Sequence, residues 1–268
     1  MISIISSLYK SDRHLNQFQK ALKGFAQGLQ RAGVDFEIIA IANEPTEAEK
    51  KFAADFSNQP WFKFTEAARE SLYASWNRGI NLALGGVVGF WNADDVRFAE
   101  SIVEADRVFA QGAELVYFPF IVKRYLSFGG LSLPLPGQTM DKQIPEFNAA
   151  SLSDFKKSMF CGPFFMFTKS LYEKVGPFDE QFKIVGDFDW CTRAAKKTDK
   201  FVKAKTIGGI FRVDGGGLSA GTNPRRVAEN NIVYSRNRAW EKIAVAEDLV
   251  IKQYRPHHVL ARGELRPI

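Results

Sequence analysis

The segment Asn92-Ala93-Asp94-Asp95 carries side chains that can bind a cation, and it follows directly on the apolar residues 87–91. An apolar run of this length is typical of a buried strand. In open α/β sheets, ligands bind at the edge where the strands end. Carboxylates grouped there can hold a divalent cation, and that cation can hold a diphosphate. The same residues also suit the N-cap of a helix, so this segment alone is a weak signal.

Four other segments with polar side chains stand in a defined order around it. One precedes the apolar run, and three follow at wide intervals. Short acidic clusters after strands are common, so the order of the segments is more informative than any one of them. The four segments are Asn77-Arg78-Gly79, Gly176-Pro177-Phe178-Asp179-Glu180, Gly186-Asp187-Phe188-Asp189 and Arg212-Val213-Asp214.

The first half of the chain alternates short apolar runs with segments of helical periodicity, which predicts the elements that position these residues. Thr46 and Glu49 have the spacing of a capping box, and this predicts the start of a helix. We expect strands at 2–7, 36–42, 61–64, 87–91 and 114–120, and helices at 15–29, 46–56, 72–84 and 98–111. This order indicates an α/β fold with a mostly parallel sheet covered by helices.

The pattern is interrupted between residues 127 and 150, where glycine and proline are frequent. These residues disfavour regular structure, and a loop of this length inside a domain is usually functional or disordered. Beyond it we expect strands at 164–167, 201–204 and 207–213, and helices from 169, at 188–197 and at 224–254. No internal repeat or sharp linker divides the sequence, so we expect one domain.

The composition is that of an ordinary globular protein. The chain has 268 residues, of which 46% are hydrophobic and 25% charged, proportions typical of a soluble domain with a substantial core. Its two cysteines are too few for a disulfide framework, and no secretory signal opens the sequence. No apolar run approaches the ~20 residues of a membrane span. We therefore expect a cytoplasmic protein.

The net charge of +6 is unevenly distributed along the chain. From Cys191 onward, 16 Lys and Arg stand against 7 Asp and Glu, whereas the first 190 residues have a small acidic excess. A basic C-terminal part can face phosphate-bearing ligands, or contact an anionic membrane from the cytoplasmic side. A solvated basic face is the alternative interpretation. The sequence has no nucleic-acid-binding motif and no concentrated Lys/Arg run, so we expect no nucleic-acid partner.

Taken in order, these segments resemble those of family 2 glycosyltransferases of the GT-A fold over residues 1–220. That family has an Asn-Arg-Gly segment, a strand ending in Asp-x-Asp-Asp, a Gly-Gly-Phe-Asp-Glu-like segment, an acidic pair before an Arg-bearing helix, and a strand end of the form Arg-x-His-x-x-x-x-Ser. The resemblance implies a Rossmann-like, mostly parallel central sheet flanked by helices. Residues 221–268 would then form a C-terminal helical extension packed on the same domain.

By position, the resemblance makes Asp94 the metal ligand that holds the donor diphosphate through Mn²⁺ or Mg²⁺. The chain departs from the family at Asn92, where an acidic residue is expected, so that position contributes no charge. Asp95 can compensate for it. Asp214 stands where the family often has His, and it is either a further oxygen ligand or a turn-forming residue before three glycines.

Asp187 matches the second member of the family's acidic pair, which implies the role of general base. The first member is Gly186 here, so a single carboxylate would do that work. Asp189 is the competing candidate. We favour Asp187, because Asp189 also suits a first-turn charge that the helix dipole stabilises.

The resemblance also places the nucleotide over the ends of the first two strands. Tyr9 would line the base pocket, and either Asn43 or Glu44 would read the base, most simply uracil. Trp76 departs from the family, which often has Arg there. The nucleotide-binding residues that we expect are Ser6, Tyr9, Asn43, Glu44, Asn77, Arg78 and Asn92.

Together these expectations describe an inverting, metal-dependent glycosyltransferase acting in polysaccharide biosynthesis or a related pathway. It would transfer a sugar from a UDP-linked donor to a hydroxyl of a glycan, a lipid-linked saccharide or a small molecule. The alternative is a catalytically inactive protein of the same fold that binds a nucleotide-sugar or serves as a scaffold. The departures at Trp76, Asn92 and Gly186 favour that alternative.

Overall fold

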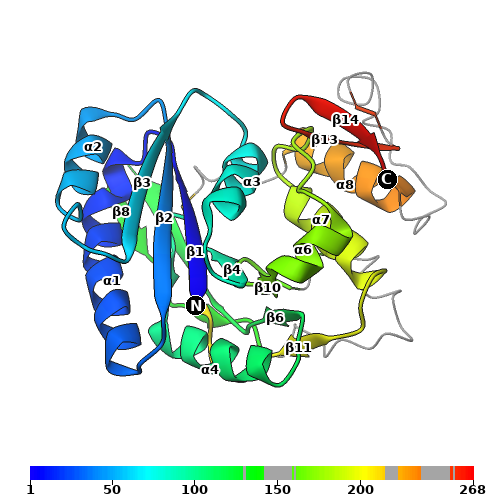
Figure 1. Ribbon diagram of the computed structural model, residues 1–268. Helices are drawn as coiled ribbons and strands as arrows, with labels where there is room; N and C mark the ends of the chain where they lie inside the picture. Colours follow the sequence, from blue (N-terminus) through cyan, green and yellow to red (C-terminus); the bar gives the residue numbers. More distant parts are fainter. Residues whose placement is uncertain (129–130, 142–158, 160, 215–222, 237–253, 256) are drawn as a thin grey trace.

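The computed structural model describes residues 1–128, 131–141, 159, 161–214, 223–236, 254–255 and 257–268. Its centre is a seven-stranded sheet with the strand order β11-β6-β10-β4-β1-β2-β3 (Figure 1). Within this sheet β10 is antiparallel to both of its neighbours, and the remaining pairs are parallel. The strands are β1 (Ile2–Leu8), β2 (Phe36–Asn43), β3 (Phe62–Ala67), β4 (Val87–Phe90), β6 (Leu115–Tyr117), β10 (Met166–Thr168) and β11 (Phe201–Lys203).

Helices cover both faces of this sheet, which explains why its central strands are buried at nearly every position. Successive residues point to opposite faces, so Ile4 joins the core on one side and Ile5 the core on the other. One face is covered by α1 (Asp12–Arg31), α2 (Glu47–Ala54) and α4 (Ala99–Ala110), and the other by α3 (Leu72–Leu82), α6 (Lys169–Val175), α7 (Gly186–Ala195) and α8 (Pro224–Arg236) (Figure 1).

Local signals of the sequence agree with the start of several of these helices. The capping box at α2 is present: the Thr46 hydroxyl accepts from the backbone N–H of Glu49, and the Glu49 carboxylate accepts from that of Thr46. By contrast, α7 begins at Gly186, two residues earlier than predicted. Asp187 therefore lies inside the first turn of this helix.

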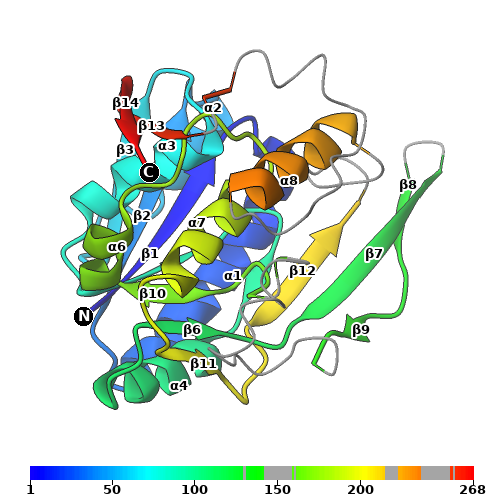
Figure 2. The ribbon, with the colours of Figure 1, turned by 90° about the vertical axis from the view of Figure 1, so that its right-hand side faces the viewer.

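A second sheet stands beside the first and corrects one prediction (Figure 2). It has the order β5-β12-β7-β8, with β9 also paired to β7. The expectation of no regular element between residues 127 and 150 was wrong for residues 131–139, which contribute two strands. Pro134 is tolerated because it ends an edge strand. These strands are β5 (Val96–Arg97), β7 (Ile121–Phe128), β8 (Leu131–Pro134), β9 (Gln138–Thr139) and β12 (Gly209–Val213).

The C-terminal part begins as predicted and ends differently. α8 starts at Pro224, and its residues Ile232 and Val233 share a core with α3 and α7. Residues 237–253 of the long helix that we expected lie outside the described part of the chain. The hairpin of β13 (His258–Ala261) and β14 (Glu264–Pro267) was not predicted. Its turn residues, Arg262 and Gly263, have φ of 53° and 79°, as a tight two-residue hairpin turn requires.

The mostly parallel α/β architecture predicted from the sequence is thus the architecture of the molecule. Among the described residues, no helix combines the length and the apolar character needed to cross a membrane.

Candidate functional site

The carboxyl edge of the central sheet carries the acidic residues that follow β4. Asp94 is partly exposed, and burial raises the pKa of its carboxyl group, as does the negative charge of Asp214. His14 and Arg13, at the start of α1, act in the opposite direction. Neither residue was predicted to belong to the site, since a lone His beside an Arg has no metal-site spacing. Only the fold brings α1 next to residues 92–95.

Asp95, the neighbour of Asp94, is buried and engaged by the protein itself. One carboxylate oxygen accepts from the backbone N–H of Arg212 at 2.9 Å, and the other accepts from the Asn92 amide at 3.5 Å. Burial raises the pKa of Asp95 well above its usual value, and the charge of Asp94 adds to this shift. Asp95 therefore links the segment after β4 to β12. Of the two aspartates, only Asp94 is open to a ligand.

Asp214, at the end of β12, lies among cations. The Arg13 and Arg212 guanidinium groups are 3.5 and 3.4 Å from the same carboxylate oxygen, and His14 is 4.0 Å away. Across the described residues, no group of three or more His, Cys, Asp or Glu side chains is arranged to hold a metal ion. A cation here would need oxygen ligands from elsewhere. Mg²⁺ commonly takes one or two carboxylates together with substrate phosphates and waters.

The second acidic centre is Asp187, in the first turn of α7. The residue as a whole is half-buried, and its Oδ1 accepts from the backbone N–H of Phe188 at 2.8 Å and from the Tyr73 hydroxyl at 3.4 Å. Burial raises the pKa of Asp187 to about 6, although both hydrogen bonds lower it. A carboxylate with this pKa is ionised at neutral pH, yet it is a stronger base than an exposed one.

Tyr73 was not predicted to belong to the site, and it explains one departure from the family pattern. It is buried in the first turn of α3, and its ring lies against the backbone of Gly186. A Cβ atom on Gly186 would come within 2.7 Å of that ring, closer than real side chains allow. The place of the missing acidic residue is therefore filled by Tyr73, whose hydroxyl contacts Asp187. No sequence signal indicated this contact, because the two residues are 114 positions apart.

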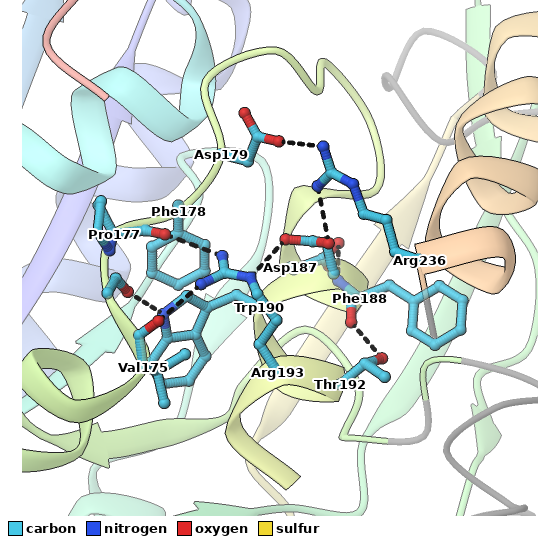
Figure 3. A network of polar contacts seen from close by, with 12 residues as sticks. Val175, Pro177, Phe178, Asp179, Asp187, Phe188, Trp190, Thr192, Arg193 and Arg236 are labelled. Carbon is cyan, nitrogen blue, oxygen red and sulfur yellow. Dashed lines mark hydrogen bonds and ion pairs between the residues drawn. The ribbon is translucent and has the colours of Figure 1, made fainter. Parts of the chain in front are cut away.

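Asp189, the competitor of Asp187, is fully buried in an ion-pair network. Arg193 and Arg236 bind its two oxygens at 2.8 and 3.0 Å. Burial alone would raise the pKa of Asp189, but the two guanidinium groups hold it below its usual value. Arg236 also reaches Asp179 at 2.7 Å, and Arg193 donates to the carbonyl of Pro177 (Figure 3). Asp189 thus anchors the loop before α7 and offers no surface to a substrate.

Three residues predicted to bind the nucleotide are buried and satisfied within the protein. The Ser6 hydroxyl donates to the carbonyl of Trp91 and so joins β1 to the end of β4. The Asn43 amide donates to the Ser75 hydroxyl at 2.8 Å. The Asn77 amide makes four hydrogen bonds, including one to the Phe178 carbonyl at 2.9 Å and one from its backbone N–H at 3.0 Å. In this arrangement Ser6 and Asn43 fix the ends of β1 and β2 to their neighbours, and Asn77 fixes α3 to residues 178–180.

The other predicted nucleotide contacts lie at the surface. Tyr9 follows β1, and the Arg69 guanidinium covers its ring at 3.4 Å from the ring centre. Glu44 is exposed after β2 with φ of 47°. Arg78 is also exposed and makes a bidentate ion pair with Glu70, Nη2 to Oε2 at 2.8 Å. Of this group, Tyr9 and Glu44 lie where the first two strands end.

Asp94 and Asp187 belong to the same edge of the central sheet, although they come from different layers. Residues 92–95 continue β4 beyond its carboxyl end. Asp187 contacts Tyr73 in the first turn of α3, and that helix begins beyond the carboxyl end of β3, which is parallel to β4 and separated from it by β1 and β2. Carboxyl ends of strands are where open α/β sheets place their ligands.

The sequence matches no protein-family model and no curated protein. Solved structures are nevertheless similar in fold. One is residues 1–349 of TarS from S. aureus in complex with UDP-GlcNAc: the TM-score is 0.65 at 16% identity, over 96% of this chain and 72% of that one. This chain spans 41% of the longer TarS chain. Another is the mannosyltransferase PcManGT from Pyrobaculum calidifontis in complex with GDP-Man and Mn²⁺, with a TM-score of 0.62 at 12% identity, over 94% and 68% of the two chains. The chain thus has the GT-A fold that its motifs indicated.

Proposed function

We propose that this chain is an inverting, metal-dependent glycosyltransferase that moves a sugar from a nucleoside diphosphate, most simply UDP, to a hydroxyl acceptor. The observation that carries the proposal is Asp187, a half-buried residue whose carboxyl group has a pKa of about 6 and which lies at the carboxyl edge of the sheet in a GT-A fold. The solved structures of similar fold support it, since their bound ligands are UDP-GlcNAc in one case and GDP-Man in the other.

Asp187 would act as the general base. Its carboxylate accepts the proton of the acceptor hydroxyl while the hydroxyl oxygen forms a bond to the anomeric carbon. The bond from that carbon to the diphosphate breaks at the same time, and the nucleoside diphosphate leaves with the electron pair. Attack opposite to the leaving group inverts the configuration. The raised pKa suits the role, because base catalysis is most efficient with a pKa near the working pH.

Asp94 would hold the cation, Mn²⁺ or Mg²⁺, together with the donor diphosphate. The residues present fit a cation site in part. Asp94 is open to a ligand, and Arg212 and Asn92 keep the neighbouring Asp95 in place. A bound divalent ion would supply positive charge to the departing diphosphate. Asp214 would be a second ligand only after its contacts with Arg13 and Arg212 rearrange, or else it would keep these two arginines in position beside the diphosphate.

Tyr9 and Glu44 would contribute to the nucleotide site at the ends of the first two strands. The acceptor that we propose is a glycan or lipid-linked saccharide, as in polysaccharide biosynthesis, or a small molecule with a hydroxyl group. Peripheral contact of the basic C-terminal part with an anionic membrane is part of the proposal. Pelleting with phosphatidylserine liposomes tests that contact: binding should fall with rising salt, because surface charges are screened.

Calorimetric titration and hydrolysis assays test the proposed function. UDP and GDP are titrated with and without Mn²⁺, and hydrolysis of UDP-GlcNAc and GDP-Man is measured for the wild type and for Asp187→Asn. We expect metal-dependent binding to both proteins, and turnover reduced about 10²–10⁴-fold in the variant. Asp106→Asn serves as the control, because Asp106 is an exposed residue of α4, which covers the opposite face of the sheet from α7. Equal turnover in Asp187→Asn and wild type would remove the base assignment.

The alternative is a protein of this fold that binds a nucleotide-sugar and does not turn it over. Two observations favour it: Asn92 supplies no charge, and the described part of the chain groups no three metal-ligating side chains. Nucleotide binding without any donor hydrolysis or transfer, in the presence of Mn²⁺ or Mg²⁺, would decide for this alternative.

A further inference from the structure

Glu229, in the middle of α8, is a fully buried carboxylate that no sequence motif indicated. Its oxygens accept hydrogen bonds from the backbone N–H groups of three successive residues, Lys183 at 3.0 Å, Ile184 at 2.9 Å and Val185 at 3.2 Å. A carboxylate that binds three consecutive N–H groups restrains the path of the backbone there, because each charge-assisted bond has a preferred direction.

Two side chains complete the surroundings of this carboxylate. The Tyr254 hydroxyl donates to Glu229 Oε1 at 2.7 Å, and Arg225 Nε donates to the same atom at 2.8 Å. Arg225 stands one helical turn before Glu229, and Tyr254 lies beyond α8. The carboxylate is therefore fully hydrogen-bonded, which offsets the cost of burying its charge.

The restrained segment leads directly into the proposed base. Val185 precedes Gly186 and Asp187, and these two residues open α7. On the other side, Gly186 is confined by the Tyr73 ring. The backbone that presents Asp187 is thus fixed from α3 and from α8 at once.

We propose that Glu229 is a positioning residue for Asp187: by binding the N–H groups of residues 183–185, it sets the entry into α7 and hence the direction of the Asp187 carboxylate. This inference rests on the proposed function, because it assigns to the C-terminal helix a part in the same reaction. Glu229 touches neither donor nor acceptor in this assignment. It acts through the backbone.

A second contact from the same helix face supports this assignment. Arg236, seven residues after Glu229 and therefore on the same side of α8, binds both Asp179 and Asp189. Arg236 contacts Asp179, before residues 183–185 (Figure 3), and Asp189, after them. With the Glu229 contacts, α8 therefore binds this part of the chain at three points. The hairpin β13–β14 adds further contacts, such as that from the Leu260 N–H to Asp179.

Glu229 also acts on Asp187 electrostatically, and its charge contributes to raising the pKa of Asp187. The other titratable groups that face Asp187 are Tyr73 from α3 and the buried Cys191 on its own helix, while the charge of Asp189 is balanced by Arg193 and Arg236. Loss of the Glu229 charge should therefore lower the pKa of Asp187. Shortening the Glu229 side chain should instead change the direction of the Asp187 carboxylate.

Two substitutions separate these effects. Glu229→Gln removes the charge and one acceptor oxygen, and we expect kcat for hydrolysis of UDP-GlcNAc or GDP-Man to fall about 10–100-fold. The acid limb of the kcat profile should move below pH 6, whereas the donor KM and the Kd of UDP should stay unchanged. Glu229→Asp keeps the charge and shortens the side chain, so kcat should fall with little movement of the acid limb.

Glu37 offers a matched control at the opposite edge of the sheet. It is also buried, and it also accepts backbone N–H groups, those of Leu84 at 2.6 Å and Gly85 at 3.3 Å, together with the Lys63 ammonium at 2.6 Å. Glu37→Gln should lower the melting temperature as much as Glu229→Gln does, with kcat and its pH profile unchanged. Where Glu229→Gln does not fold, Tyr254→Phe against Lys63→Met repeats the comparison with single donors removed, and kcat should fall only in Tyr254→Phe.

The outcomes distinguish the inference from the function on which it rests. If Asp187→Asn is inactive while Glu229→Gln, Glu229→Asp and Tyr254→Phe keep the wild-type kcat and acid limb, the positioning role is wrong and the glycosyltransferase proposal stands. If the wild type turns over no donor, or Asp187→Asn equals the wild type, the base assignment fails and the inference falls with it. A selective loss of kcat with unchanged donor KM in the Glu229 variants supports both.

Discussion

The two acidic pairs at the carboxyl edge of the sheet, Asp94–Asp95 and Asp187–Asp189, are built alike but neutralised differently. In each pair the first residue is partly exposed and the second is buried. Asp189 is bound by two arginines, whereas Asp95 accepts hydrogen bonds from a backbone N–H and from the Asn92 amide. The pKa is accordingly low at Asp189 and well above its usual value at Asp95.

This difference shows how the same residue type serves two chemical purposes. At the Asp187 centre, the protein balances the charge of the scaffold carboxylate itself, so the exposed one can act as a single base. At the Asp94 centre, part of the negative charge is left uncompensated by the fold. Such a centre suits a bound cation, in agreement with the metal-dependent function that we propose.

The largest expected effect is on the stability of the Asp187 centre. Asp189→Asn leaves two buried guanidinium groups without their shared carboxylate, and the free energy of unfolding should fall by about 3–5 kcal/mol. Asp95→Asn leaves no arginine or lysine without its ion-pair partner among the described contacts, so the free energy of unfolding should change by less than about 1 kcal/mol. Urea unfolding of both variants measures the two values. Equal losses would contradict the comparison.

A smaller effect is expected from Gly186→Ala, because its Cβ would lie 2.7 Å from the Tyr73 ring. Overpacking of this kind costs about 1–3 kcal/mol of unfolding free energy. The combined variant Tyr73→Ala with Gly186→Ala should show a favourable coupling, since the smaller residue removes the clash. Strictly additive losses in a double-mutant cycle would argue against the contact.

Asp187→Asn should stabilise the protein at neutral pH although it lowers turnover. The folded pKa of about 6 lies above that of an unfolded Asp, so the stability associated with this group is present at low pH and is lost as the pH rises through 6. Replacing the carboxylate by a neutral amide should therefore raise the unfolding free energy at pH 8 by about 1–2 kcal/mol. Below pH 4 the variant and the wild type should be equally stable in thermal unfolding.

The smallest effect is expected at Tyr73→Phe. The Tyr73 hydroxyl donates to Asp187 and lowers its pKa, so removing it should raise that pKa. The acid limb of kcat should move upward by roughly half a unit, because this bond to the carboxylate is long, at 3.4 Å, and therefore weak. A pH–rate profile of the two proteins checks the direction, and a downward shift would contradict it.

Local patterns predicted much of the fold correctly. The alternation of strands and helices, the capping box at Thr46 and Glu49, and the start of α8 at Pro224 are confirmed. Such features depend on residues a few positions apart, so a pattern in the sequence can report them. Of the second sheet, only β12 lies in a predicted strand, that at 207–213, and the hairpin β13–β14 was missed. Strands as short as β5 and β9 have too few residues to show a period, and Gly and Pro interrupt the pattern around β8.

For the candidate site, the sequence by itself determined which residue types stand at the carboxyl edge of the sheet and in what order. It could not determine which of them face a ligand. Hydrogen bonds to distant segments engage the side chains of Ser6, Asn43 and Asn77. Burial excludes Asp95 and Asp189 from contact with a ligand. Tertiary structure alone decided that Tyr73 and Glu229 converge on the start of α7, since residues far apart in the chain meet only when layers pack and every buried polar group must find a partner.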